Sequence, residues 1–107
     1  MTTSWHSETF ANGIHAFVGG SGTPVVLLPG WPETAEAYTE VFRALSERHR
    51  TFSIDPPDLE SSTHRQPGYD TAIIGELLGE SLRPVLGASY RLVGHDVGAW
   101  IAYAWAA

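Results

Sequence analysis

A short motif, Gly-His-Asp-Val-Gly at residues 94–98, limits the fold of this chain more than any other feature. An apolar run at residues 90–93 precedes the motif, and an apolar, helix-forming run over residues 99–107 follows it. Glycine tolerates backbone conformations that other residues avoid, so the two glycines permit a sharp turn around the central Asp96. The sequence therefore predicts a β-strand, a strained turn and an α-helix in immediate succession.

This arrangement is typical of a nucleophile elbow, in which the central side chain is exposed at the end of a strand and is usually Ser. Here the central residue is Asp96. A carboxylate nucleophile forms an ester with the alkyl carbon that it attacks. That chemistry suits the opening of an epoxide or the displacement of a halide better than the cleavage of an ester or an amide. We predict that Asp96 is a catalytic nucleophile.

Strands and helices are expected to alternate along the remainder of the chain. Short apolar segments predict strands, and apolar residues at helical spacing predict helices. The expected strands cover residues 9–18 (one or two strands around an Asn12-Gly13 turn), 25–28, 51–54 and 90–93, and the expected helices cover residues 34–48, 71–86 and the run after Asp96. Strands that alternate with helices form βαβ units, so we predict an α/β fold with a mostly parallel sheet.

Several of these segments carry more specific expectations. The all-apolar residues 25–28 fit a strand that is buried on both faces. Thr34 and Asp70 are plausible N-caps for the two helices that follow them. The expected apolar face of the first helix consists of Ala37, Tyr38, Val41, Phe42 and Leu45. The second helix is expected to end or kink at Pro84. The residues of the last helix that are expected to pack in the core are Trp100, Tyr103 and Trp105.

Composition narrows the class of protein. The 107 residues allow at most one domain, and a formal net charge of −6 argues against binding to nucleic acid or to an anionic membrane surface. The absence of cysteine excludes disulfides and thiolate metal sites. No signal peptide is recognisable, and no apolar run approaches the ~18 residues of a membrane span. We expect a cytoplasmic protein with no cofactor and no metal.

A second motif, Pro29-Gly30-Trp31-Pro32-Glu33, follows the strand predicted at residues 25–28. In α/β-hydrolases the oxyanion hole uses two backbone N–H groups, one from the residue after the nucleophile and one from a loop after an earlier strand. Val97 and Trp31 occupy these two places in the sequence. We predict that their N–H groups form the oxyanion hole.

Together the two motifs resemble those of epoxide hydrolases, the Asp-nucleophile branch of the α/β-hydrolase fold. Residues 29–33 are similar to the His-Gly-x-Pro-Glu motif of that family, with Pro29 in place of His, and residues 94–98 are similar to its Gly-His-Asp-x-Gly elbow. The resemblance implies that residues 1–107 are the N-terminal portion of an α/β-hydrolase core domain, ending inside the helix after the elbow. It also implies a cis Trp31-Pro32 peptide bond and places Pro32 and Glu33 near a small-molecule substrate.

The family resemblance implies a two-step mechanism. Asp96 would form an alkyl-enzyme ester, and a water molecule activated by a His paired with an acid would hydrolyse it. That His, its acid and two lid tyrosines have no counterpart in these residues, so the chain by itself is expected to be inactive. His95 is interpreted as structural, and the other histidines (His6, His15, His49 and His64) as solvated or packed in loops.

Two other functions stay open. One is a haloacetate dehalogenase of the same branch, acting on a halogenated acid. A haloalkane dehalogenase is disfavoured because Val97 stands where those enzymes usually have Trp. The other is a catalytically incomplete fragment, or a subunit that depends on a partner. The strand at residues 90–93 would leave an unpaired, apolar sheet edge, so we expect self-association or association with a missing C-terminal part.

Overall fold

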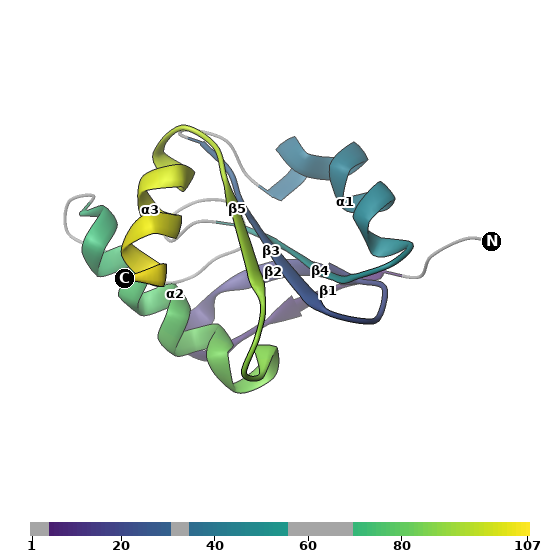
Figure 1. The fold of residues 1–107 in the computed structure, drawn as a ribbon, viewed down its shortest axis with the longest axis horizontal. Helices are drawn as coiled ribbons and strands as arrows, with labels where there is room; N and C mark the ends of the chain where they lie inside the picture. Colours follow the sequence, from purple (N-terminus) through teal and green to yellow (C-terminus); the bar gives the residue numbers. More distant parts are fainter. Residues whose placement is uncertain (1–4, 31–34, 56–69) are drawn as a thin grey trace.

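The computed structural model describes residues 5–30, 35–55 and 70–107, which form one sheet with helices on both faces (Figure 1). The strands are β1 (Trp5–Thr9), β2 (His15–Gly19), β3 (Pro24–Leu28), β4 (Arg50–Ile54) and β5 (Arg91–Gly94). The helices are α1 (Thr39–Ser46), α2 (Thr71–Leu86) and α3 (Val97–Ala106), and two short 3-10 turns are η1 (Ala11–Gly13) and η2 (Ala35–Tyr38). The predicted alternation of strands and helices is confirmed.

The sheet has the strand order β1-β2-β4-β3-β5. β4, β3 and β5 are parallel to one another, whereas β1 pairs with β2 and β2 with β4 in antiparallel fashion. The sheet is therefore mixed rather than mostly parallel in the described residues. The short η1 connection can join β1 and β2 only as antiparallel neighbours, whereas the parallel strands are joined through helices.

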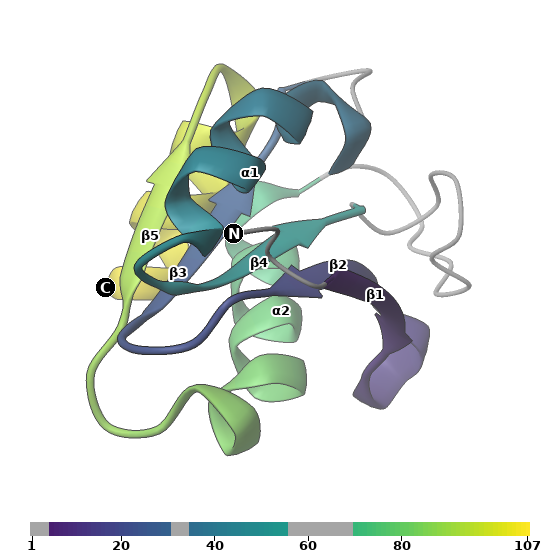
Figure 2. The same ribbon diagram turned by 90° about the vertical axis from the view of Figure 1, so that its right-hand side faces the viewer.

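The sheet separates two groups of helices. α1 lies on one face, and α2 and α3 lie together on the other (Figures 1 and 2). Val26 and Leu28 of β3 belong to the core beneath α2 and α3, while Val25 and Leu27 pack with Phe42 of α1. The expectation that residues 25–28 are buried on both faces is confirmed, and it follows from the alternation of side chains along a strand.

The first helical segment differs from the expected continuous helix over residues 34–48. It begins as the 3-10 turn η2 and becomes α-helical only at Thr39, ending at Ser46. Of the predicted apolar face, Phe42 is buried and Tyr38 and Leu45 pack against it, but Ala37 and Val41 are exposed. The change from three to 3.6 residues per turn rotates the apolar side chains out of a single stripe. Thr34 lies outside the described residues.

Helix α2 has the predicted bounds. The Asp70 side chain caps it by accepting hydrogen bonds from the Ala72 and Ile73 N–H groups at 2.9 and 3.3 Å. The helix continues past Pro84 to Leu86, so Pro84 does not end it, and the alternative that Pro84 kinks the helix stays a prediction. Pro84 has no N–H, so one backbone carbonyl in the preceding turn loses its helical donor. Because Pro84 is exposed, water can reach that carbonyl.

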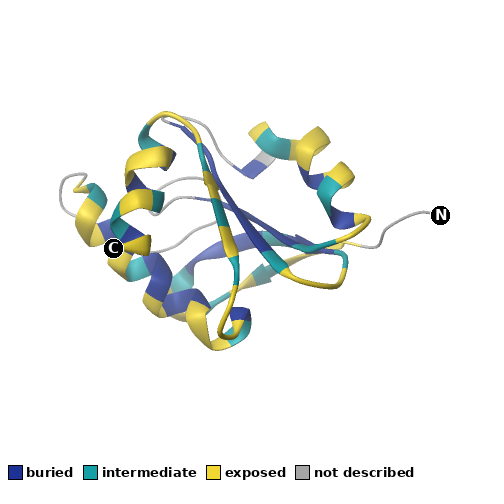
Figure 3. Ribbon diagram, in the orientation of Figure 1, coloured by how far each residue is buried: buried dark blue, intermediate teal, exposed yellow. Residues whose placement is uncertain are grey.

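Helix α3 is apolar but is only partly buried. Trp105 is buried, and its indole N–H donates to the Tyr90 hydroxyl at 2.9 Å. Trp100 and Tyr103 are 69% and 76% exposed, so the expectation that they pack in the core is wrong within the described residues. Figure 3 shows the exposed outer side of α3 next to β5, the last strand in the sheet order. α2 and β5 cover only the inner side of this helix.

Candidate functional site

The carboxyl ends of β3 and β5 lie side by side at the centre of the site. Their register pairs Leu28 with Gly94, so both strands end at the same edge of the sheet. The chain leaving β3 enters the α1 segment on one face, whereas the chain leaving β5 enters α3 on the opposite face (Figure 2). Such a switch point leaves a crevice outside the strand ends, where ligands bind in open α/β sheets.

Asp96 occupies a strained turn at this switch point. Its φ of 57° and ψ of −125° lie outside the common regions for a residue with a Cβ. The Gly98 N–H donates to the His95 carbonyl at 2.9 Å, and the Ala99 N–H donates to that of Asp96 at 3.0 Å. The predicted strand–turn–helix and the strained turn at its tip are confirmed. Backbone strain of this kind gathers at functional sites and persists only where the surrounding structure enforces it.

The two flanking glycines allow the turn, because neighbouring backbone atoms approach them too closely for a Cβ. A Cβ at Gly94 would collide with the Gly98 carbonyl in the first turn of α3. A Cβ at Gly98 would collide with the Leu28 carbonyl and lie 2.6 Å from the Pro29 oxygen. The Gly-x-Asp-x-Gly pattern is thus required because α3 starts directly against the ends of β5 and β3.

The Leu28 carbonyl joins the elbow to the α1 segment. It accepts a hydrogen bond from the His95 N–H at 3.2 Å and another from the Tyr38 hydroxyl at 3.1 Å. Leu28 is the last residue before Pro29-Gly30, where the second sequence motif begins. The start of that loop is therefore held next to Asp96 by the elbow itself. His95 is exposed, and its backbone carries this contact.

Of the two predicted oxyanion donors, the structure describes Val97 but not Trp31. Val97 is the first residue of α3, and N–H groups in the first turn have no acceptor within their own helix. These N–H groups form the positive end of the helix dipole, next to Asp96 at the N-cap. Trp31, Pro32 and Glu33, together with the predicted cis peptide bond at Trp31-Pro32, lie outside the described residues.

A buried polar cluster that was not expected from the sequence connects β2, the end of β4 and the start of η2. His15 Nδ1 is 2.6 Å from Asp55 Oδ2, and both side chains are buried. Asp55 Oδ1 accepts from the Ala35 N–H at 2.8 Å, and the Ser53 hydroxyl donates to the Ala35 carbonyl at 2.8 Å. The interpretation of His15 as solvated or loop-packed is wrong, because it lies in β2 opposite the end of β4. The feature of the sequence that could have indicated this cluster is Asp55, a carboxylate directly after the buried strand β4.

The other described histidines agree with the expectation of a surface or packing role. His6 is exposed beside Glu8, with its Nε2 2.8 Å from Oε1 of that residue. His49 is half-buried after α1. His64 lies outside the described residues.

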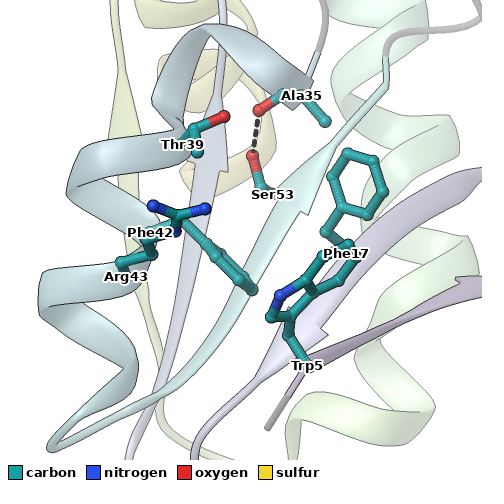
Figure 4. Close-up of a pocket in the computed structure, with 7 residues that line it drawn as sticks. All are labelled: Trp5, Phe17, Ala35, Thr39, Phe42, Arg43 and Ser53. Atoms are coloured by element: carbon teal, nitrogen blue, oxygen red, sulfur yellow. Dashed lines mark hydrogen bonds between the residues drawn. The ribbon is translucent and has the colours of Figure 1, made fainter. Parts of the chain in front are cut away.

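A small cavity lies between the sheet and the α1 segment, as Figure 4 shows. Its volume is about 180 Å³, and it is lined by Trp5, Phe17, Ala35, Thr39, Phe42, Arg43 and Ser53. No elbow residue is among them, so this cavity is separate from the turn at Asp96. Within the described part of the chain, no group of three or more His, Cys, Asp or Glu side chains could hold a metal ion. No helix there is long and apolar enough to span a bilayer.

Comparison with known proteins agrees with this geometry. Residues 23–107 match the model of the alpha/beta hydrolase fold family. The soluble epoxide hydrolase of Corynebacterium sp. (strain C12) is 29% identical over 100 residues, which are 92% of this chain and 35% of that protein. The chain thus spans about a third of that relative's length.

Two solved structures are similar along nearly the whole chain. Cfl2 from Burkholderia cenocepacia is 32% identical, with a TM-score of 0.83 over 99% of this chain and 37% of Cfl2. The epoxide hydrolase CorEH is 28% identical, with a TM-score of 0.81 over 97% of this chain and 37% of CorEH. The family match covers β3, β4 and β5, and with them the elbow at Asp96. This chain belongs to the α/β-hydrolase fold family, and it is similar to the epoxide hydrolases within that family.

Proposed function

We propose that this chain carries the nucleophile of an epoxide hydrolase-like enzyme, and that Asp96 is that nucleophile. One observation carries the proposal: the tip of the elbow, at the switch point of the sheet, is an exposed carboxylate with φ 57°. The resemblance to a soluble epoxide hydrolase supports the same substrate class. A carboxylate in this position attacks an alkyl carbon, whereas a hydroxyl there would attack an acyl carbon.

The first step forms one bond and breaks another. A carboxylate oxygen of Asp96 attacks an epoxide carbon, the carbon–oxygen bond of the ring breaks, and the alkoxide takes up a proton. The product is a hydroxyalkyl ester of Asp96. Water then adds to the ester carbonyl, and the N–H groups of Val97 and Trp31 would stabilise the resulting oxyanion, an effect of ~3 kcal/mol per donor in comparable sites. Collapse of this intermediate releases a diol and restores the carboxylate.

The test is covalent labelling of the purified chain. Incubation with a terminal epoxide such as styrene oxide should add one alkyl group per chain, located on Asp96 by peptide mass spectrometry. Asp96→Asn should remain unlabelled because an amide is a poor nucleophile, whereas Glu76→Gln, which removes an exposed carboxylate of α2, should label like wild type. Equal labelling of Asp96→Asn, or labelling at other positions only, would refute the proposal.

The same experiment separates the alternatives. Bromoacetate in place of the epoxide tests the haloacetate dehalogenase reading, since attack by Asp96 would then release bromide. We expect the chain by itself to stop at the ester, because the activation of water is assigned to none of its residues. Sustained release of diol or halide by the purified chain would contradict that expectation, and the absence of any labelling would favour a partner-dependent subunit.

A further inference from the structure

The Asn12-Gly13 turn between β1 and β2 carries a chemistry that the proposed function does not use. Asn12 is the only asparagine of the chain, and glycine follows it. Because glycine has no Cβ, its backbone nitrogen can approach the side-chain amide of the preceding asparagine with little steric hindrance. Asn12 is exposed, so water and base can reach it. The sequence is therefore suited to the spontaneous loss of ammonia from the Asn12 side chain.

That reaction proceeds through a succinimide ring. The Gly13 nitrogen gives its proton to a base and attacks Cγ of Asn12, the bond between Cγ and Nδ2 breaks, and ammonia leaves. Water then opens the succinimide at either carbonyl, so that aspartate or isoaspartate stands in place of the asparagine. Water is the only co-reactant, and nothing is oxidised or reduced.

The backbone of the folded turn holds the reacting atoms apart. Asn12 has φ 63° and ψ 18°, a left-handed conformation that asparagine adopts more readily than most residues. At this ψ the Gly13 nitrogen nearly eclipses the backbone nitrogen of Asn12, whereas ring closure needs it to eclipse Cβ. Gly13 continues the turn with φ 72°. Ring closure therefore requires rotation about the Cα–C bond of Asn12, which would take Gly13 out of its place in the turn.

Hydrogen bonds from both sides of the turn oppose that rotation. The Gly13 N–H donates to the Phe10 carbonyl at 3.2 Å, so the attacking nitrogen is engaged. Asn12 Nδ2 donates to Ser81 Oγ at 2.9 Å, and the Ser81 hydroxyl donates to the Leu77 carbonyl of α2 at 2.8 Å. Ser81 is 3% exposed. The leaving group of the reaction is thereby tied to a buried side chain of α2.

We propose that Asn12 is a deamidation site whose reaction is blocked while Ser81 holds the turn against α2. The turn must first open locally, which releases the Asn12 side chain and frees the Gly13 N–H. Local openings of this kind require less free energy than global unfolding. Loss of ammonia makes the change irreversible. Isoaspartate lengthens the backbone between β1 and β2 by a methylene group, and aspartate has no N–H to donate to Ser81. Asp96 takes no part in this reaction.

The first measurement is the rate of deamidation at mildly alkaline pH, followed by peptide mass spectrometry at residue 12. The folded chain should react about tenfold or more slowly than the same chain unfolded in guanidinium chloride, because the reaction waits for the turn to open. Ser81→Ala removes the acceptor of the Asn12 side chain. It should raise the rate of the folded chain by about threefold to tenfold, which corresponds to the net contribution of one hydrogen bond.

Ser89→Ala is the matched control, since it removes an exposed hydroxyl beyond the end of α2, and it should react like wild type. Ser81→Cys serves if Ser81→Ala does not fold, because a thiol fills similar space but is a weaker acceptor. A folded wild type that reacts as fast as the unfolded chain would overturn the proposal. So would a folded Ser81 variant that reacts at the wild-type rate.

The second measurement separates local opening from a loss of overall stability. Amide hydrogen exchange of Gly13 reports the opening of the turn, and that of Phe52 in the central strand β4 reports the opening of the sheet. In Ser81→Ala the Gly13 N–H should exchange faster, while the Phe52 N–H should exchange as in wild type. Equal acceleration at both amides would show that Ser81 supports only the overall stability, and would overturn its role at the turn.

Discussion

Gly98 shows at the scale of a single residue how packing overrides intrinsic preference. In a helix, alanine is favoured over glycine by about 1 kcal/mol. Here a Cβ would collide with the Leu28 carbonyl at the end of β3, so α3 would have to move away from the sheet. Gly98→Ala should therefore lower the free energy of unfolding by about 1–3 kcal/mol. Urea unfolding followed by circular dichroism measures this change.

Ala99 is the matched position for that experiment, since it is the next residue of α3 and is exposed. Ala99→Ser should stay within about 0.5 kcal/mol of wild type. A Gly98→Ala variant as stable as wild type would show that α3 does not start against β3. If α3 does move away from the sheet, Gly98→Ala should also slow the alkylation of Asp96, because the elbow would shift with the helix.

At the scale of an element, the start of α2 depends on a single side chain. Asp70 satisfies two N–H groups that have no acceptor within the helix, those of Ala72 and Ile73. Asp70→Ala should lower the free energy of unfolding by about 0.5–2 kcal/mol, measured by urea unfolding. Asp70→Ser should retain most of the stability, because a serine hydroxyl can accept the same hydrogen bond. Equal loss in both variants would argue against capping.

The contact between α2 and α3 is set by a glycine on the inner side of α2. A Cβ at Gly75 would lie 2.9 Å from both the Ile101 carbonyl oxygen and the Trp105 nitrogen, so the two backbones approach closely. This contact keeps the inner side of α3 against the core. The elbow therefore rests on two elements, β3 through Gly98 and α2 through Gly75.

At the scale of the whole molecule, the described chain has an open side. Among the strands of the described residues, β5 pairs only with β3, and Val93 is 41% exposed. The adjoining side of α3 exposes Trp100 and Tyr103, and a groove runs along it past Tyr90 and Leu92. An unpaired strand edge beside exposed aromatic side chains is a template for another strand. We propose that this side associates with a second copy or with further α/β-hydrolase core sequence.

Sedimentation velocity over a range of concentrations tests the association. Wild type should show a rising average mass, whereas Val93→Lys should remain monomeric because a charged side chain blocks edge pairing. Ile73→Lys is the control, since Ile73 is 47% exposed on α2, away from this edge. A wild type that is monomeric at every concentration would contradict association with a second copy, and a Val93→Lys variant that associates equally would contradict pairing through the edge of β5.

Local features were predicted well from the sequence, and long-range partnerships were not. The bounds of α2, its Asp70 cap and the strained turn at Asp96 follow from residues close together in the chain, as do the strands at residues 25–28 and 51–54. Helical spacing, capping chemistry and glycine placement act over a few residues, so they are legible without a structure. Asp96 and Val97 were proposed as site residues in the same way, with help from a family motif, and their catalytic roles stay predictions.

The strand order and the partners of buried polar groups were decided only by the tertiary structure. His15 and Asp55 are 40 residues apart, and nothing in the local sequence of either one names the other. The antiparallel pairing of β2 with β4 likewise depends on how the first hairpin folds onto the sheet. The sequence by itself determined which segments form strands and helices and where the strained turn at Asp96 lies, because those choices depend on local backbone energetics. Only the packing of the sheet determined which polar groups meet and which apolar surfaces remain exposed.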